Sequence, residues 1–438
     1  MSSSPQVTAG STPLPRVPVI VGGNRIPFGK AGGGYAAASN QDMLTAALDG
    51  LVARFGLAGE RLGEVAAGAV LKHAKDFNLT REAVLGSALA PSTPAYDLQQ
   101  ACGTGLETVI HVANKIALGQ IDVGIAGGVD SASDAPIAVS DGLRAALLKA
   151  SRAKTLPQRL SALAAIRPRD FTPQTPRNSE PRTGLSMGEH QAITAKTWGI
   201  TREAQDVLAA SSHHNLAAAW ESGFFDDLAT PYLRMTRDQG LRPDTSAEAL
   251  AKLKPVFGKG EGATMTAGNS TPLSDGAALV LVADQDWARE RHLPTLARIV
   301  DAEVAAVDYV CGDEGLLMAP AYAVSRLLDR QGLRLQDFDE YEIHEAFAST
   351  VLATMAAWES EEFCTQRLGR DAALGSIDRT KLNIHGSSLA AGHPFAATGG
   401  RIVATLAKSL SERGPGSRGL VSICAAGGQG VVAILEAV

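Results

Sequence analysis

The chain has only four cysteines, and no two of them lie close together in the sequence. No two cysteines form a CxxC motif, so the spacing excludes the usual zinc-ligand pattern and gives no disulfide framework. The sequence therefore predicts no metal site, and unpaired thiols favour a reducing, cytoplasmic location. The four cysteines are Cys102, Cys311, Cys364 and Cys424.

Long hydrophobic runs and an excess of positive charge are also missing. No apolar run reaches the roughly 18 residues that a membrane-spanning helix needs. The formal net charge of -6 argues against nucleic acid as a partner. Residues 1–15 are rich in Ser, Thr and Pro and lack the charged and apolar segments of a secretory signal, so we expect a disordered tail.

Strand and helix patterns alternate along the chain. Apolar residues make up 45% and charged residues 20% of the 438 positions, which suits a globular protein of roughly two to three domains. The alternation of strands and helices begins again near residue 296. Each half contains a helix, an apolar strand and a glycine pair in that order. This parallel predicts an α/β fold built from two similar halves. Expected strands cover 17–21, 64–70, 123–128, 277–283 and 419–423, and expected helices cover 41–55, 81–89 and 399–410.

A segment between the strands near 128 and 277 interrupts the first half. Within residues 140–182 nine Lys or Arg side chains face three acidic ones, and the leucines among them predict amphipathic helices. Two readings stay open, a solvated excursion or a contact with an anionic surface such as coenzyme A phosphates, a membrane or a partner subunit. Two further helices are expected between 187 and 225, the second capped by Thr201. The predicted parts are a tail over 1–15, an N-terminal half over 16–131 and 262–285, an inserted loop domain over 132–261, and a C-terminal half over 286–438.

Cys102 stands at the start of a predicted helix in the stretch Gln99–Gly105. A helix N-terminus favours a thiolate, so we expect the Cys102 pKa to lie below the usual value near ~8.5. Gly103 and Gly105 would leave the approach to the thiol open. The alternative is a buried structural cysteine in a glycine-rich turn.

Further motifs place reactive side chains among small residues. A thiolate nucleophile needs a neighbour that accepts its proton, and acyl transfer needs donors for a developing oxyanion. Two His and two Cys so placed supply both. The motifs are His344-Glu345-Ala346-Phe347-Ala348, Gly386 to Pro394 with its Gly392-His393-Pro394, and Cys424-Ala425-Ala426-Gly427-Gly428-Gln429-Gly430.

With these motifs in this order, the sequence resembles the thiolase family from Val17 to Val438. The resemblance implies a thiolase fold, in which two similar βαβ-rich halves form a layered α-β-α-β-α core with an inserted, mainly helical loop domain. It implies that Cys102 is the nucleophile, that His393 activates it and helps to bind the thioester oxygen, and that Cys424 is the acid/base. The backbone N–H groups of Cys102 and Ala426 would form an oxyanion hole.

His344 departs from the commoner family pattern, which has Asn at this position. His-Glu-Ala-Phe is similar to the thiolase β-subunit of fatty-acid oxidation trifunctional complexes, and so is the stretch Lys154–Ser161. The resemblance implies that His344 holds the thioester oxygen, and that the basic insertion meets a membrane or a partner. It also implies that Met187 lies near the acyl pocket and that Thr271 meets coenzyme A.

The resemblance implies a 3-ketoacyl-CoA thiolase that forms an acyl-enzyme, with coenzyme A as a substrate and no resident cofactor. Acyl-CoA and coenzyme A are the expected small partners. A homodimer or homotetramer, a hydratase/dehydrogenase partner subunit and peripheral membrane contact are also expected. The alternatives are an acetyl-CoA acetyltransferase working in the condensing direction, a ketoacyl synthase, and a non-catalytic acyl-CoA or lipid carrier on the same scaffold.

Overall fold

The computed structural model describes residues 16–258, 260 and 262–438. The expected disordered tail over 1–15 lies outside the described residues. A long mixed sheet runs through the molecule in the order β10-β11-β12-β9-β1-β8-β5-β3-β4, and β2 pairs with β8. The N-terminal strands are β1 (Pro18–Arg25), β2 (Gly29–Lys30), β3 (Glu64–Ala67), β4 (Ala95–Asp97), β5 (Val123–Ser131) and β8 (Ser274–Asp284), and the C-terminal strands are β9 (Ala297–Ala306), β10 (Glu340–Ile343), β11 (Arg418–Ala425) and β12 (Gln429–Ala437).

The two halves of this sheet repeat one pattern. In the N-terminal half β3 and β5 are parallel, while β5–β8 and β8–β1 are antiparallel. In the C-terminal half β10 and β11 are parallel, while β11–β12 and β12–β9 are antiparallel. Within the described residues, strand pairing links the two half-sheets only where Val19 pairs with Arg298 and Ile20 with Ala297. The structure thus has the two similar halves that the sequence predicts.

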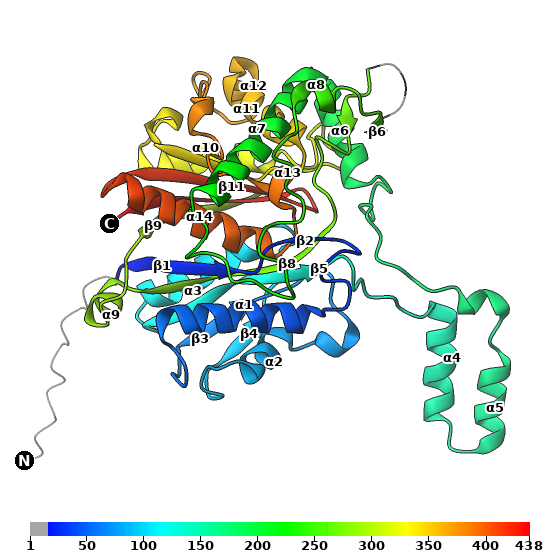
Figure 1. Cartoon of the computed structure of the whole chain (residues 1–438). Coiled ribbons are helices and arrows are strands. Elements are labelled where there is room, and N and C mark those ends of the chain that lie inside the picture. The colour runs from blue at the N-terminus through cyan, green and yellow to red at the C-terminus, as the bar shows by residue number, and fades with distance from the viewer. Residues whose placement is uncertain (1–15, 259, 261) are drawn as a thin grey trace, which may run out of the picture.

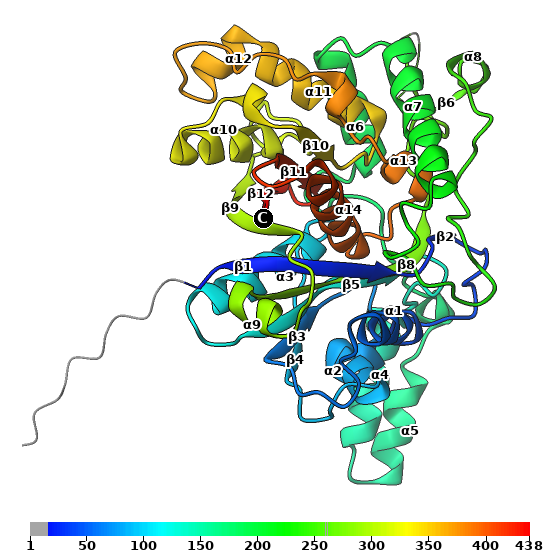
Figure 2. The ribbon, with the colours of Figure 1, turned by 60° about the vertical axis from the view of Figure 1, so that its left-hand side comes forward.

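Helices cover both faces of each half-sheet (Figure 2). Separate apolar clusters fill the space under the outer helices of the N-terminal half, the space between the halves, and the space under the outer helices of the C-terminal half. The result is the five-layered α-β-α-β-α core that the resemblance implies. The outer helices are α1 (Asn40–Phe55) and α2 (Leu79–Gly86) on one side and α10 (Ala319–Gln331) and α11 (Ala348–Glu359) on the other, and the central pair is α3 (Thr104–Ala117) and α14 (Ala397–Arg413).

The two central helices approach each other through glycines. A Cβ atom at Gly105 would lie 2.6 Å from the carbonyl oxygen of Ala396, and one at Gly399 would lie 2.1 Å from the backbone nitrogen of Leu106. Because a side chain at either position would clash with backbone, only glycine permits this crossing. The close approach brings the N-terminal ends of α3 and α14 together.

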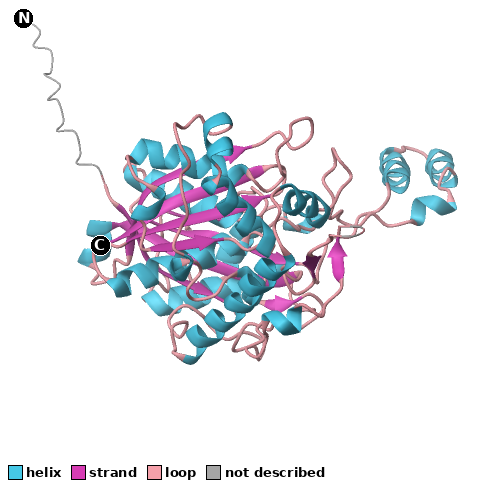
Figure 3. Cartoon of the chain, turned by 90° about the horizontal axis from the view of Figure 1, so that it is seen from above, coloured by secondary structure: helices cyan, strands magenta, loops and turns pink. Residues whose placement is uncertain are grey.

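A long excursion separates β5 from β8. Its first two helices form a hairpin that projects from the body of the molecule, as Figures 1 and 3 show. Thr201 caps α7 by accepting a hydrogen bond from the Ala204 N–H, as the sequence predicts. The residue boundaries of the four predicted parts remain predictions. The excursion contains α4 (Asp141–Arg152), α5 (Leu156–Ala164), α6 (Met187–Thr197), α7 (Arg202–Glu221), α8 (Ala247–Leu250), β6 (Pro255–Phe257) and β7 (Met265–Thr266).

Several element bounds differ from those read in the sequence. β5 continues to Ser131 rather than ending at the glycines, because residues 129–131 pair with β8. α14 begins at Ala397, so the loop holding His393 ends before the helix starts. Among the described residues no helix is long and apolar enough to cross a bilayer. The remaining elements are α9 (Gln285–Glu290), α12 (Glu361–Gln366), α13 (Ser388–Ala391), and the 3-10 turns η1 (Ala74–Asp76), η2 (Pro168–Phe171), η3 (Leu335–Asp337) and η4 (Arg379–Lys381).

Candidate active site

Cys102 lies on a tight turn between β4 and α3. Ala101 has a φ of 47°, in the left-handed region that side chains other than glycine rarely adopt. The Thr104 hydroxyl holds this turn: it donates to the Ala101 carbonyl at 2.7 Å and accepts the Gln100 N–H at 2.8 Å. The turn therefore fixes the Cys102 thiol two residues before the helix.

His393 faces this thiol from the loop before α14. Its Nε2 lies 3.1 Å from the Sγ of Cys102, and its Nδ1 lies 2.6 Å from the hydroxyl of Thr398. Ser274 accepts the His393 backbone N–H at 3.2 Å, and the Asp130 carboxylate accepts the N–H of Ala396 at 2.9 Å. The end of β5 and the start of β8 thus hold the loop that carries His393.

The Cys102–His393 pair is neutral at rest. Burial raises the pKa of Cys102 to about 12, although the N–H groups of Ala426 and of Cys102 itself act in the opposite direction. Burial, together with the charge of Arg401, lowers the pKa of His393 to about 3. The thiol therefore donates to Nε2, and Nδ1–H donates to Thr398.

Two expectations about Cys102 were wrong. The pKa is raised rather than lowered, because desolvation of the thiolate outweighs the N–H donors near the start of α3. Gly105 does not serve to open the approach to the thiol, since it faces the backbone of α14. Gly103 faces Val431 and Gln100, where a Cβ atom would lie 2.8 Å from the Val431 side chain. At both positions the missing side chain allows neighbouring segments to pack closely around Cys102.

His344 lies directly after β10, beside His393. The two ring centroids are 4.1 Å apart. His344 Nδ1 lies 2.8 Å from the Ser388 hydroxyl, and its buried Nε2 has no hydrogen-bond partner among the described residues. Burial lowers the pKa of His344 well below 6.5, and the neighbouring His393 and Arg401 act in the same direction. A neutral imidazole with one open nitrogen results.

The neighbouring Glu345 fixes this segment. Its buried carboxylate accepts hydrogen bonds from the Ser212 hydroxyl at 2.7 Å and the Asn383 amide at 2.7 Å. It also accepts the Leu389 N–H at 3.0 Å. Glu345 thereby ties the His344 loop to α7 and α13, and its role is structural.

Cys424 is the second-last residue of β11 and lies close to Cys102. It is 3% exposed in an apolar cluster that includes Phe347, Met187 and Tyr309. Burial raises the Cys424 pKa, and the nearby Cys102 raises it further. After Cys424 the chain turns through Gly427 and Gly428, both with positive φ. This turn directs the Ala426 N–H at the Cys102 sulfur.

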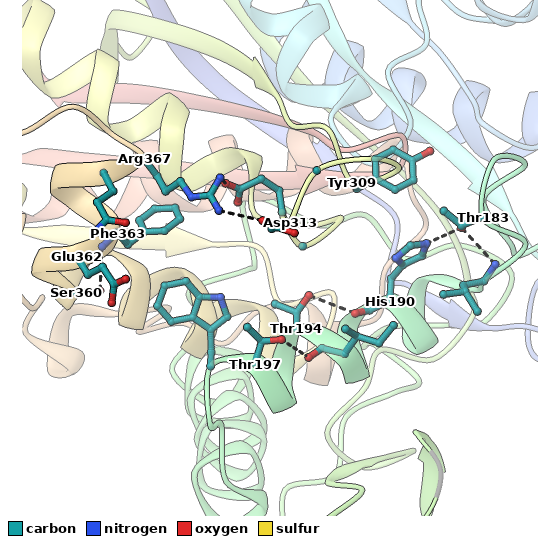
Figure 4. Close-up of a pocket in the computed structure, with 17 residues that line it drawn as sticks. Thr183, His190, Thr194, Thr197, Tyr309, Asp313, Ser360, Glu362, Phe363 and Arg367 are labelled. Carbon is teal, nitrogen blue, oxygen red and sulfur yellow. Dashed lines mark hydrogen bonds and ion pairs between the residues drawn. The ribbon is translucent and has the colours of Figure 1, made fainter.

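Glu180, in the inserted segment, holds this turn. One carboxylate oxygen accepts the Gly427 N–H at 2.8 Å, and the other accepts the Tyr309 hydroxyl at 2.8 Å. Tyr309 also lines a cavity of about 630 Å³ between α6 and α12 (Figure 4). Trp198 and Phe363 also line it, and none of the four predicted catalytic residues borders it.

The two remaining predicted residues, Met187 and Thr271, lie near the Cys424 and His344 segments. Met187 is the first residue of α6 and packs in the Cys424 cluster. Thr271 donates its hydroxyl to the Ala346 carbonyl at 3.0 Å, within the His344 motif. The other two cysteines lie elsewhere: Cys311 is exposed, and Cys364 is buried with its thiol near the carbonyls of α11.

Sequence reasoning missed several residues that position this site. Ser388 and Thr398 lie in or near the Gly386–Pro394 motif, and each contacts a site histidine. Glu180 gave no local signal, because its partners Tyr309 and Gly427 are distant in the sequence. The contact of Arg401 with Ser388, 13 positions earlier, depends on how α13 packs against α14 and could not be read from the sequence either. No group of three or more His, Cys, Asp or Glu in the described part of the chain is arranged to hold a metal ion.

Comparison with known proteins finds two matching family models, related sequences and a similar solved structure. The family model described as "Thiolase, N-terminal domain" matches residues 18–286, and "Thiolase, C-terminal domain" matches residues 293–437. Proteins named 3-ketoacyl-CoA thiolase from Yersinia pestis (strain Pestoides F) and Yersinia pseudotuberculosis serotype O:1b (strain IP 31758) are each 39% identical, covering 97% of this chain and 99% of the relative. The crystal structure of a Bacillus anthracis acetyl-CoA acetyltransferase superposes with a TM-score of 0.78 at 30% identity, covering 97% of this chain and 99% of that one.

Proposed function

The chain belongs to the thiolase family, and we propose that it cleaves 3-ketoacyl-CoA with coenzyme A through an acyl group carried on Cys102. The protein is an acyltransferase of fatty-acid oxidation type, and acyl-CoA and coenzyme A are its substrates. The observation that carries the assignment of roles is the 3.1 Å approach of His393 Nε2 to the Cys102 sulfur. Coenzyme A enters as a substrate and not as a resident cofactor.

In the first half-reaction Cys102 attacks the 3-keto carbon. Its proton passes to His393 Nε2, which is already in contact with the thiol. The tetrahedral oxyanion is stabilised by the N–H groups of Cys102 and Ala426. Both donors are supported by their orientation toward the sulfur in the resting state.

Collapse of this intermediate breaks the bond between C2 and C3. The electron pair moves to C2 and is delocalised onto the thioester oxygen, which accepts hydrogen bonds from His344 and from the protonated His393. Cys424 then donates its proton to C2, and acetyl-CoA leaves. The acyl group stays on Cys102.

In the second half-reaction coenzyme A attacks the acyl-enzyme. The coenzyme A thiol gives its proton to the Cys424 thiolate, and its sulfur displaces Cys102. The Cys102 thiolate recovers its proton from His393, so both cysteines return to thiols. Kinetics are therefore ping-pong. The same residues run the condensing direction when acetyl-CoA and acyl-CoA are abundant, which is the acetyl-CoA acetyltransferase alternative.

A thiolysis assay with 3-ketoacyl-CoA substrates of increasing chain length tests this function. We expect consumption of the substrate only when coenzyme A is present, with release of acetyl-CoA. Cys102→Ala abolishes the reaction, whereas Cys311→Ala, which removes an exposed cysteine away from the site, leaves it unchanged. Full activity of the Cys102→Ala variant would rule out the mechanism.

For the projecting hairpin of α4 and α5 we propose contact with an anionic membrane surface. Between residues 141 and 164 there are five Lys or Arg side chains and one Asp. Leu156 and Leu160 are 69% and 58% exposed, so the hairpin offers apolar side chains beside its charges. Such a surface suits a bilayer with acidic headgroups, where each basic side chain contributes about 1 kcal/mol.

Liposome co-sedimentation of the full-length protein tests this contact. Deletion of residues 144–169 should abolish pelleting with anionic vesicles, while Leu118→Ser, which changes a leucine that is 73% exposed outside the hairpin, should not. Equal pelleting of the deletion variant would remove the proposal. Pelleting only in the presence of a hydratase/dehydrogenase subunit would favour the partner contact.

We also propose a homodimer or homotetramer in a reducing, cytoplasmic compartment. The compartment is supported by the chemistry, because Cys102 and Cys424 must both stay as thiols. Light scattering coupled to size exclusion distinguishes the two assemblies from a monomer.

A further inference from the structure

The hydrogen bonds around His344 Nδ1 can be assigned from the chemistry of its neighbours. The Ser388 hydroxyl oxygen lies 2.8 Å from His344 Nδ1 and 3.1 Å from Nη2 of Arg401. A guanidinium has donors and no acceptor, so the Ser388 oxygen accepts from Arg401. The single hydroxyl hydrogen of Ser388 is then free to point elsewhere.

That hydrogen has one acceptor within reach. Among the described residues the only groups in hydrogen-bond contact with the Ser388 hydroxyl are Arg401 and His344 Nδ1. If Nδ1 carried a proton and donated it to Ser388, the buried hydroxyl hydrogen would lack an acceptor, which is unfavourable. Ser388 therefore donates to Nδ1, and Nδ1 is unprotonated.

We propose that Ser388 and Arg401 are positioning residues that hold His344 in the Nε2–H tautomer, so that its open nitrogen presents a hydrogen-bond donor. This inference rests on the proposed function, in which that donor meets the thioester oxygen. Nε2 is buried and unpartnered among the described residues, as a donor reserved for substrate would be. The opposite tautomer would present a lone pair and repel the same oxygen.

Arg401 is held where this assignment needs it. It is 4% exposed on α14, and Nη2 also donates to the Ser387 hydroxyl at 3.0 Å. Because the positive charge of Arg401 also disfavours a second proton on His344, the same residue supports both the tautomer and the neutral state.

The two adjacent serines allow a matched test. Ser387 and Ser388 both accept a hydrogen bond from Arg401, but only Ser388 contacts His344. Ser388→Ala removes the donor to Nδ1, whereas Ser387→Ala removes an equivalent Arg401 contact without touching the histidine. Ser388→Thr keeps a hydroxyl and serves as the conservative rescue.

Nitrogen-15 NMR of the resting full-length protein, labelled on its nine histidines, reads the tautomer directly. The His344→Gln spectrum identifies the His344 signals. We expect wild type, Ser387→Ala and Ser388→Thr to have the proton on Nε2, and Ser388→Ala to gain a population with the proton on Nδ1. A wild-type proton on Nδ1, or a Ser388→Ala spectrum unchanged from wild type, would overturn the inference.

A kinetic measurement accompanies the spectrum. We expect Ser388→Ala to lower kcat for thiolysis at least tenfold with the KM for coenzyme A unchanged, and Ser388→Thr to restore most of kcat. Equal kcat values for Ser387→Ala and Ser388→Ala would contradict the inference. The spectrum requires no turnover, so a correct tautomer without thiolysis would reject the proposed function alone, and thiolysis with the wrong tautomer would reject this inference alone.

Discussion

The Nε2 atom of His393 lies 3.1 Å from the Sγ atom of Cys102, although the two residues are 291 positions apart in the sequence. Both groups are neutral at rest, because burial raises the pKa of the thiol and lowers that of the imidazole. A neutral pair needs no counter-charge in a buried site, and the proton moves only when the sulfur attacks. The Cys102 thiolate therefore forms only as the sulfur attacks the substrate.

The open nitrogen of His344 predicts a specific kinetic loss. His344→Ala removes one donor to the thioester oxygen, so kcat should fall by about 100- to 1,000-fold, the usual effect of losing one oxyanion donor. Coenzyme A affinity should change little, because this donor acts on charge that develops during the reaction. Steady-state kinetics and coenzyme A titration measure the two effects, with His111→Ala as a control at an exposed position on α3. Equal losses in both quantities would exclude this role for His344.

Cys424 should be needed for one partial reaction and not for another. Exchange of labelled coenzyme A with acyl-CoA proceeds through Cys102 and His393. It can continue without Cys424, because the coenzyme A thiol, which gives its proton to Cys424 in the intact enzyme, can also form a thiolate near neutral pH. Breaking the bond between C2 and C3 requires a proton for a carbanion, which Cys424 supplies. Cys424→Ala should therefore keep the exchange and lose thiolysis by at least 100-fold, in line with the loss of a general acid. Cys364→Ala, which removes a buried cysteine outside the site, should keep both reactions, and a Cys424→Ala variant with wild-type thiolysis would contradict the assignment.

The main site residues and the two similar halves could be predicted from the sequence. The four motifs predicted the residues that meet at the site, since each carries a reactive side chain among small residues at the end of a strand or loop. The repeated order of helix, strand and glycines predicted the two halves. Alternation and helical spacing are local properties, and they can be read without knowledge of packing.

Properties that depend on distant neighbours could not be read in this way. The direction of the Cys102 pKa shift was predicted wrongly, because desolvation depends on the layers that cover the thiol. The role of Gly105 emerged only from its approach to α14, nearly 300 residues later in the chain. In the sequence Glu180 is one acidic residue in a basic segment, and in the structure it holds the turn that presents the Ala426 N–H.

The crossing of α3 and α14 predicts a stability difference between two glycines. A Cβ atom at Gly399 would meet the Leu106 backbone at 2.1 Å, whereas the nearest atom that one at Gly86 in α2 would meet outside its own helix turn is Thr45 Cγ2, at 3.7 Å. Gly399→Ala should therefore lower the free energy of unfolding by about 1–3 kcal/mol or more, as overpacked cores do. Gly86→Ala should leave stability unchanged or slightly raised. Urea denaturation measures both, and an unchanged midpoint for Gly399→Ala would contradict the close crossing.

The buried His213 predicts acid sensitivity. Burial, with the nearby Arg242 charge, lowers its pKa from 6.5 to about 4, and its Nδ1 accepts the Arg242 N–H at 3.2 Å. Because the unfolded chain takes up this proton first, the stabilisation is complete above pH 6.5 and is lost as the pH falls toward 4. The full loss is about 3 kcal/mol for this residue.

Urea denaturation between pH 7.5 and 4.5 tests this prediction. His213→Gln should show a shallower fall in unfolding free energy than wild type, because glutamine does not titrate and its side-chain oxygen can still accept the Arg242 N–H. His111→Gln changes an exposed histidine and should follow the wild-type curve. Parallel curves for wild type and His213→Gln would show that His213 does not contribute.

The central claim is that Cys102 carries the acyl group, and trapping that intermediate tests it most directly. The full-length protein is mixed with a 3-ketoacyl-CoA in the absence of free coenzyme A, quenched in acid, and analysed by mass spectrometry of the intact chain and its peptides. The account predicts one acyl group on Cys102, one acetyl-CoA released for each site, and loss of the adduct as acyl-CoA when coenzyme A is added. Absence of an adduct on Cys102, together with full thiolysis by the Cys102→Ala variant, would contradict it.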